Sequence, residues 1–144
     1  MGKILAIDYG SVRIGIAVSD ESGTIAFGRE ALANDEKAID KIKKIVTADD
    51  ISCIILGYPL NLKGKKTPQT LEVESFEGKL KSNFSSEPFN CITISRWDER
   101  FTSKMAADSM IESGMKKKKR KDKSNIDIIS AAILLQSYLD SKKI

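Results

Sequence analysis

The beginning of the chain alternates short apolar runs with turns. Apolar and β-branched residues dominate Ile4–Ile7 and Ile14–Val18, and the turn Asp8–Ser11 lies between them. Two such runs joined by a short glycine-containing turn predict a β-hairpin. A third strand is predicted at Thr24–Ala33, because Gly23 provides a turn before it. We therefore expect three hairpin-linked strands at the start of the fold.

The rest of the chain alternates helical periodicity with further strands. Apolar residues recur at helical spacing between charges in Asp35–Thr47, which predicts an amphipathic helix. Ile51–Gly57 is almost wholly apolar, and this is typical of a strand buried on both faces of a sheet that helices cover. The remaining predicted elements are a helix at Thr70–Phe84, a strand at Asn90–Ser95, a helix at Thr102–Ser113, and a strongly apolar, largely buried helix at Asn125–Ser141.

The predicted order of elements is β-β-β-α-β-α-β-α-α, which indicates an α/β fold. Hairpin-linked strands pair antiparallel, whereas strands joined through a crossover helix pair parallel. We therefore expect a mixed five-stranded sheet, with three antiparallel strands and two parallel ones, flanked by helices. This is the order of elements in the ribonuclease H-like fold. The length of 144 residues predicts a single domain over residues 1–144.

Composition excludes several kinds of chemistry and of location. The chain has no histidine, which excludes Ser-His-Asp and Cys-His catalysis as well as histidine-bound zinc. Cys53 and Cys91 lack metal-binding spacing, so we expect both to be reduced and buried within strands. No apolar run approaches the roughly 20 residues of a membrane helix, and no signal-peptide pattern opens the chain. We therefore expect a cytoplasmic protein with no membrane partner.

Positive charge is concentrated in one segment. The net charge of the chain is +4, but residues 116–123 read Lys-Lys-Lys-Lys-Arg-Lys-Asp-Lys, so this segment is strongly positive and the remainder is slightly negative. Such a run is often only a solvated loop. Here the run directly precedes the predicted helix Asn125–Ser141, which carries the acid Asp127. A dense positive patch beside acidic residues suits a polyanionic substrate. The candidate nucleic-acid-binding residues of the run are Lys116, Lys117, Lys118, Lys119, Arg120 and Lys121.

Three acids stand at the ends of predicted elements. Asp8 follows the first strand, Glu99 follows the last, and Asp127 lies in the first turn of the final helix. Strand ends on the same side of a sheet lie near one another, so these carboxylates are expected to converge. Mg²⁺ and Mn²⁺ prefer oxygen ligands, and two such ions can activate water and stabilise the leaving oxygen of a phosphodiester without histidine. The pattern therefore indicates a metal-dependent phosphodiesterase.

Each acid also has a purely structural explanation. Asp8 suits a turn, Ser124-x-x-Asp127 matches a capping box, and Glu99 can pair with Arg100 at the surface. Asp98 is a further acid near the proposed site, for which a surface position is favoured over a role as a fourth ligand.

Other residues around the acids also suggest contacts with nucleic acid. Gly10 and Gly15 are interpreted as room for a nucleic-acid backbone, and Lys63, Lys65 and Lys66 as further phosphate contacts. The aromatic residues that flank the acids are candidates for base stacking, although packing is favoured for Trp97; they are Tyr9, Trp97 and Phe101.

Four ordered motifs resemble those of the YqgF, or RuvX-like, family of pre-16S rRNA nucleases, also described as Holliday-junction-resolvase-like. Together they span almost the whole chain: Asp8-Tyr9-Gly10 through Ala17, Gly57-Tyr58-Pro59 through Gly64, Asp98-Glu99-Arg100-Phe101-Thr102-Ser103, and Lys117–Lys121 followed by Asp127, Ala131-Ala132 and Leu135–Leu139. Ser103 and Ser130 depart mildly from the family pattern, and neither removes a carboxylate.

The resemblance implies a ribonuclease H-like fold, a cytoplasmic location and a nuclease that depends on Mg²⁺ or Mn²⁺, with two ions expected. It implies action on structured RNA in 5′-end maturation of pre-16S rRNA, or on branched DNA as a resolvase. It assigns the catalytic and metal-binding roles to Asp8, Glu99 and Asp127. Arg13 and Arg100 match basic positions of the motifs, which implies phosphate contact.

Two rival functions stay open at the level of sequence. Asp8-x-Gly10 through Gly15 also resembles the first phosphate loop of the sugar kinase, actin and Hsp70 group, which predicts a nucleotide-binding module. The lysine run alone predicts a non-catalytic RNA-binding factor in ribosome assembly. The enzyme predicts that cleavage is lost on changing Asp8. The binding factor predicts salt-sensitive RNA binding that persists when all three acids are changed, with no product formed.

Overall fold

A computed structural model describes residues 2–99 and 123–142. Five strands form one mixed sheet in the order β3-β2-β1-β4-β5. The first three pair antiparallel, and β4 pairs parallel with both β1 and β5. The strands are β1 (Lys3–Tyr9), β2 (Arg13–Ser19), β3 (Ala26–Ala33), β4 (Ile51–Tyr58) and β5 (Thr93–Asp98). The predicted mixed five-stranded sheet is confirmed.

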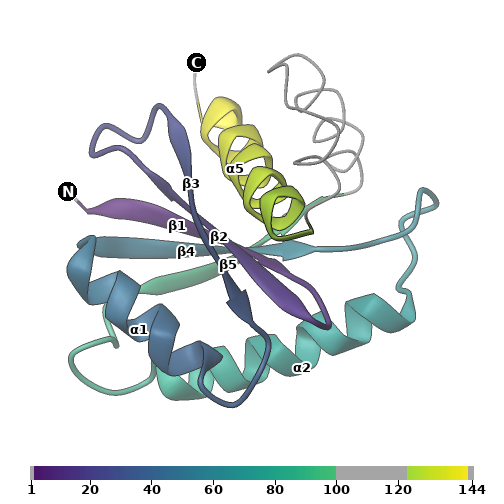
Figure 1. The fold of residues 1–144 in the computed structure, drawn as a ribbon, viewed down its shortest axis with the longest axis horizontal. Helices are drawn as coiled ribbons and strands as arrows, with labels where there is room; N and C mark the ends of the chain where they lie inside the picture. The colour runs from purple at the N-terminus through teal and green to yellow at the C-terminus, as the bar shows by residue number, and fades with distance from the viewer. Residues whose placement is uncertain (1, 100–122, 143–144) are drawn as a thin grey trace.

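Helices cover both faces of this sheet (Figure 1). The helices α1 (Ala38–Ala48) and α2 (Pro68–Asn83) lie on one face, and α5 (Lys123–Ser141) lies on the other. The predicted helix at Thr102–Ser113 lies outside the described residues, as do Arg100, Phe101 and the basic residues 116–121. Within the part of the chain that the structure describes, no helix is both long enough and apolar enough to cross a membrane.

Side-chain alternation along the strands divides the core into two layers. In β1, Leu5 and Ile7 pack toward α1 and α2, whereas Ala6 packs toward α5. The layer under α5 contains small strand residues such as Ala6 and Ala17. Burial of Ala131, Leu134, Leu135 and Leu139 fixes α5 against the sheet, at about 25 cal/mol per Å² of apolar area removed from water. The sheet face that carries Asp8 is therefore the face that α5 covers.

Hydrogen bonds of side chains set several element ends that periodicity alone missed. The helix α2 begins two residues earlier than predicted, because Thr67 caps it: the Thr67 Oγ1 accepts a bond from the Thr70 N–H and the Thr70 Oγ1 accepts one from the Thr67 N–H. The strand β3 begins later than predicted, because the Asp20 carboxylate accepts bonds from the N–H groups of Thr24 and Ile25 and holds both in a turn.

The predicted last strand, Asn90–Ser95, is wrong by three residues at each end, since β5 is Thr93–Asp98. The register with β4 runs from Cys53↔Thr93 to Tyr58↔Asp98, so the strand continues through the polar residues that were expected to follow it. The prediction that Cys91 is buried in a strand is also wrong. Cys91 is exposed in the turn that precedes β5, whereas Cys53 is partly buried in β4, and both are free thiols.

Candidate active site

Asp8 lies on the central strand, on the sheet face that α5 covers. It follows Ala6 by two residues, and residues two apart in a strand share a face. Its neighbour Tyr9 points to the opposite face, where its ring lies 4.8 Å from that of Phe76 on α2. Tyr9 is therefore a packing residue, and the suggestion that it stacks on bases finds no support in its position.

Glu99 reaches Asp8 across the strand between them. Because β4 lies between β1 and β5, a residue at the end of β5 must cross β4 to meet β1. Gly57 of β4 makes this possible: a Cβ at Gly57 would lie 2.2 Å from the Glu99 Oε2. The Glu99 backbone N–H donates to the Tyr58 carbonyl at 3.3 Å, and its carboxyl group hydrogen-bonds that of Asp8. The structure thus joins two of the three predicted acids directly.

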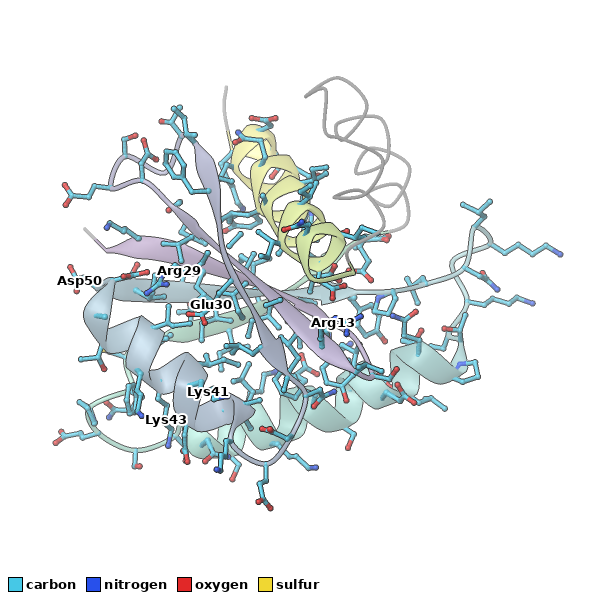
Figure 2. The ribbon with its side chains drawn as sticks, viewed as in Figure 1. Arg13, Arg29, Glu30, Lys41, Lys43 and Asp50 are labelled. Carbon is cyan, nitrogen blue, oxygen red and sulfur yellow. The ribbon has the colours of Figure 1, made fainter. Side chains whose placement is uncertain are left out.

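Asp127 is a neighbour of this pair, but its carboxylate is bound elsewhere. Its backbone carbonyl packs on Gly15, where an added Cβ would lie 2.2 Å from the oxygen, and Gly15 pairs with Asp8 across β1 and β2. The Asp127 Oδ2 accepts a bond of 3.0 Å from the Arg13 Nε. Figure 2 shows Arg13 on β2 near the first turn of α5. Arg13, predicted to contact phosphate, holds Asp127 in this structure.

The space beside the glycines of the opening motif is occupied by backbone carbonyl groups of the same chain. The space at Gly15 is filled by the Asp127 carbonyl, and a Cβ at Gly10 would lie 2.5 Å from the Arg13 carbonyl oxygen. The interpretation of Gly10 and Gly15 as room for a nucleic-acid backbone is therefore wrong. Sequence reasoning also missed that Gly57 makes space for Glu99. Its position at the end of the apolar run Ile51–Gly57, directly before Tyr58-Pro59, was the available signal.

Burial and like charge shift the titration of the acid pair. Burial, reinforced by the negative charge of Asp127, raises the pKa of Asp8 to about 6. Burial, reinforced by the negative charge of Asp8, raises the pKa of Glu99 to about 8. The pair therefore retains a proton at neutral pH, and a bound cation can replace that proton. Two desolvated carboxyl groups with oxygen donors only are a donor set that fits Mg²⁺ or Mn²⁺.

The described residues do not form a complete metal cage. Within residues 2–99 and 123–142, no group of three or more histidine, cysteine, aspartate or glutamate side chains is arranged to hold a metal ion. The carboxylate of Asp127, the third candidate ligand, pairs with the Arg13 guanidinium in this structure. Release of Asp127 from Arg13 would make the third acid available to the Asp8 and Glu99 pair.

The acid pair predicts how stability depends on pH and metal. Asp8 and Glu99 bind protons more tightly in the folded state than at their ordinary pKa values of 3.8 and 4.5. Their contribution to the stability of the metal-free protein is therefore fully present below about pH 4, and it is lost as the pH rises toward about 8. A cation that neutralises the pair reverses this loss, so the rise in Tm on adding Mg²⁺ or Mn²⁺ should grow from acidic to alkaline pH.

Thermal unfolding in EDTA and in millimolar Mn²⁺, followed across this pH range, checks the prediction. The Glu99→Gln variant should show a flatter pH dependence without metal and a smaller metal-induced rise in Tm. A metal effect of equal size at acidic and alkaline pH would contradict the assignment of the pair.

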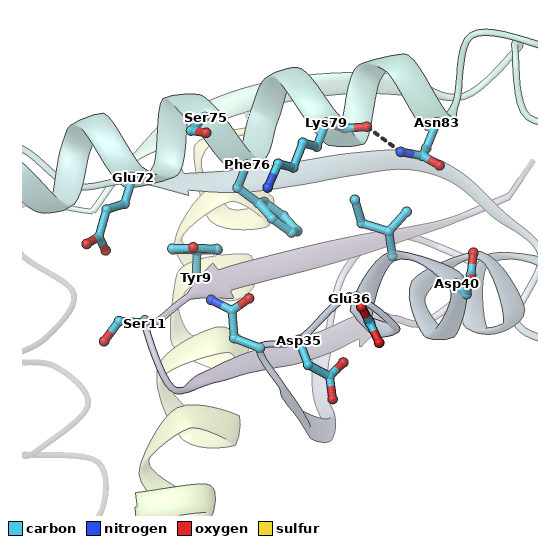
Figure 3. A pocket seen from close by; sticks show the side chains of 12 residues that line it. Tyr9, Ser11, Asp35, Glu36, Asp40, Glu72, Ser75, Phe76, Lys79 and Asn83 are labelled. Carbon is cyan, nitrogen blue, oxygen red and sulfur yellow. Dashed lines mark hydrogen bonds between the residues drawn. The ribbon is translucent and has the colours of Figure 1, made fainter.

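A separate cavity of about 820 Å³ lies on the other face of the sheet, between α1, α2 and the β1–β2 turn (Figure 3). Tyr9 and Phe76 contribute aromatic rings to its wall. None of the three candidate acids lines it. Among the described residues that line it are the acids Asp35, Glu36, Asp40 and Glu72 and a single basic residue, Lys79, so the charge of this described lining repels a polyanion. The acid pair, and not this cavity, is the candidate site for phosphodiester chemistry.

Packing also accounts for Trp97, as expected. The indole packs in the layer under α5, edge-on to Tyr138 with ring centroids 5.4 Å apart, and its Nε1–H donates to the Ser137 Oγ at 3.3 Å. Asp98 is exposed at the end of β5, the surface position that the sequence favoured for it.

Comparison with known proteins gives the family. The family model described as "RuvX: Holliday junction resolvase" matches residues 2–141. The chain belongs to the RuvX family. Among RuvX-family relatives, a Flavobacterium psychrophilum protein named "Putative pre-16S rRNA nuclease" is 43% identical over 142 residues, which cover 99% of each chain. A protein of the same name from Amoebophilus asiaticus is 38% identical over 143 residues, covering 99% of this chain and 97% of the relative.

Solved structures confirm the predicted ribonuclease H-like fold of this RuvX-family chain. The Fowlpox virus resolvase, in complex with Holliday junction DNA, matches with a TM-score of 0.60 at 17% identity and covers 96% of this chain and 97% of its own. RuvC of T. thermophilus, in complex with a Holliday junction substrate, matches with a TM-score of 0.59 at 11% identity, covering 99% and 97%. At these identities the likeness concerns the fold alone.

Proposed function

We propose that this RuvX-family protein is a cytoplasmic, divalent-metal-dependent nuclease that hydrolyses phosphodiester bonds of structured RNA, at the 5′ end of pre-16S rRNA. The observation that carries the proposal is the hydrogen-bonded pair of partly buried carboxyl groups, Asp8 and Glu99, where β1 and β5 end under α5. Holding two carboxyl groups together in a partly buried place costs desolvation and charge repulsion that an apolar pair would not incur. The names of the relatives from F. psychrophilum and A. asiaticus support the choice of RNA.

Asp8, Glu99 and Asp127 are the residues that would hold Mg²⁺ or Mn²⁺, and we propose two ions. Bound there, the metal supplies Lewis acidity and a water of lowered pKa. Residues of the chain itself position the three carboxylates. Asp8 is fixed by the central strand, Gly57 gives Glu99 its path to Asp8, and Arg13 orients Asp127. If Asp127 were instead to bind the metal, the Arg13 guanidinium would be free for a substrate phosphate.

Basic residues would hold the polyanionic substrate around this centre. We propose that Arg100 and the run Lys116–Lys121 bind backbone phosphates, which agrees with the motif positions of the RuvX family. Such contacts make affinity fall steeply with salt. The match of the family model to residues 2–141 supports a single functional domain over residues 1–144.

Cleavage assays test the proposal. The substrates are a pre-16S-like RNA with its 5′ extension and a four-way DNA junction of equal strand length, each with Mg²⁺, Mn²⁺ or EDTA. We expect metal-dependent cleavage of the RNA and none in EDTA. Cleavage of the junction alone would favour resolution of branched DNA, the second candidate, which the description of the family model supports. Binding of RNA without any product would overturn the nuclease assignment and favour a ribosome assembly factor.

A further inference from the structure

A loop of defined shape follows β4 directly. The Asn61 Oδ1 accepts bonds of 2.9 Å from the backbone N–H groups of Lys63 and Lys65. The Asn61 N–H donates to the Lys65 carbonyl at 3.0 Å, and the Gly64 N–H donates to the Asn61 carbonyl at 2.8 Å. Gly64 has a φ of 78°, a conformation that glycine adopts without strain. Residues 60–66, the Asn61 loop, are therefore closed on themselves.

The base of the Asn61 loop is fixed to α2. The buried Thr70 hydroxyl donates to the Pro59 carbonyl, and the Lys66 Nζ pairs with the Glu74 carboxylate at 2.8 Å. The Tyr58 hydroxyl donates to the same carboxylate at 2.8 Å. Lys66, which was grouped with Lys63 and Lys65 as a phosphate contact, is thus engaged in anchoring the loop. The loop cannot swing freely about its ends.

The anchored loop is tied to the acid pair. Tyr58 accepts the backbone bond of Glu99, and Gly57 contacts the Glu99 carboxyl group. Asn61 is three residues beyond Tyr58, so it lies within about 11 Å of Tyr58 at 3.3–3.6 Å per residue. One strand of a duplex advances about 3.4 Å per nucleotide. A nucleic-acid strand that runs from the acid pair toward the loop would therefore reach it within a few nucleotides of the reacting bond. Figure 1 shows the segment projecting beyond the end of β4.

The tip of the loop carries charge and an exposed apolar side chain. Lys63 and Lys65 are exposed, and neither makes an ion pair within the described part of the chain. Leu62 between them and Asn61 is 77% exposed, more than any other large hydrophobic residue in the described ranges. A single exposed leucine is common on a protein surface. Leu62, however, lies on an anchored loop that also carries two exposed lysines. This arrangement matches the way proteins place apolar side chains against bases while cations hold the nucleic-acid backbone.

We propose that the Asn61 loop is a nucleic-acid contact element, in which Lys63 and Lys65 bind substrate phosphates near the reacting bond and Leu62 lies against an unpaired base. The inference rests on the proposed nuclease function and extends it. It gives the site a preference for duplexes with a single-stranded extension or branch, because a fully paired duplex offers no free base face to Leu62.

Binding by fluorescence anisotropy in EDTA, where no cleavage is expected, tests the loop. The probes are an RNA hairpin with a single-stranded 5′ extension and a blunt RNA duplex of the same nucleotide count. For the Lys63→Ala/Lys65→Ala variant, we expect about tenfold weaker binding to both probes and a slope of log K against log salt that is shallower by about 1.5 to 2. For Leu62→Ser, we expect an unchanged slope, about fivefold weaker binding to the extended hairpin, and wild-type binding to the blunt duplex.

The matched control is Lys41→Ala/Lys44→Ala, which removes two exposed lysines from α1. This helix lies on the far side of the sheet from α5 (Figure 1). All replaced side chains are exposed, so Tm should match that of the wild type in each variant. Loop variants that bind like this control, while the wild type cleaves RNA, would overturn the loop inference and leave the nuclease intact. A wild-type protein that neither binds nor cleaves would overturn the proposed function, and the loop inference with it.

Discussion

Asp8→Asn is expected to lower the rate of RNA cleavage in Mg²⁺ or Mn²⁺ by at least about 100-fold. The change keeps the size of the side chain and a hydrogen-bonding partner for Glu99, but it removes the anionic oxygen at the centre of the acid pair. A metal that stabilises charge in a transition state contributes several kcal/mol, and about 3 kcal/mol corresponds to a factor of 100. Single-turnover cleavage measured with excess enzyme isolates this effect from product release.

Stability separates a catalytic role of Asp8 from a structural one. Burial and the charge of Asp127 disfavour the ionised form of Asp8, as its raised pKa indicates. The neutral amide introduced by Asp8→Asn avoids this penalty, so the metal-free variant should unfold at or above the wild-type Tm at pH 8. Asp40→Asn, an equal change at an exposed position of α1, serves as the control and should retain full activity. An Asp8→Asn protein that keeps more than about a tenth of the activity would contradict the assigned site.

Gly15→Ala is expected to destabilise the protein by about 3 kcal/mol or more and to abolish cleavage. The added Cβ would lie 2.2 Å from the Asp127 carbonyl oxygen and 2.8 Å from its carbonyl carbon, which are backbone atoms and cannot rotate aside. Either α5 moves away from the sheet or β2 bends, and overpacking of this kind costs about 1–3 kcal/mol or more. Movement of α5 also carries Asp127 away from Asp8. Denaturant unfolding and the cleavage assay measure the two effects.

Gly78→Ala provides the matched control for this substitution. Gly78 lies inside α2, and a Cβ there meets nothing within 4 Å. Because alanine favours a helix interior over glycine by about 1 kcal/mol, this variant should be slightly more stable than the wild type and fully active. A Gly15→Ala variant that unfolds at the wild-type midpoint would show that α5 does not press on β2 as described.

Local patterns in the sequence were sufficient for most of the fold. The apolar, β-branched run Ile4–Ile7 predicts the first strand, and the helical spacing of apolar residues predicts α1 and α5, because both depend on residues close in the chain. The end of β5 was mispredicted because Arg96, a charged residue, is stabilised inside the strand by a distant partner. Its guanidinium donates to both carboxylate oxygens of Glu77, at 2.9 and 2.7 Å.

The candidate site likewise has positions that local sequence predicts and contacts that only the tertiary structure sets. The sequence by itself determined that Asp8 follows the first predicted strand, that Glu99 follows the last and that Asp127 opens a buried helix, since each position follows from local patterns of residues. Only the tertiary structure decided which groups meet. Glu99 reaches Asp8 because Gly57, on the strand between them, has no side chain, and Asp127 is bound by Arg13, which lies 114 residues away in the chain. Such contacts depend on strand register and helix packing, which no local pattern of residues records.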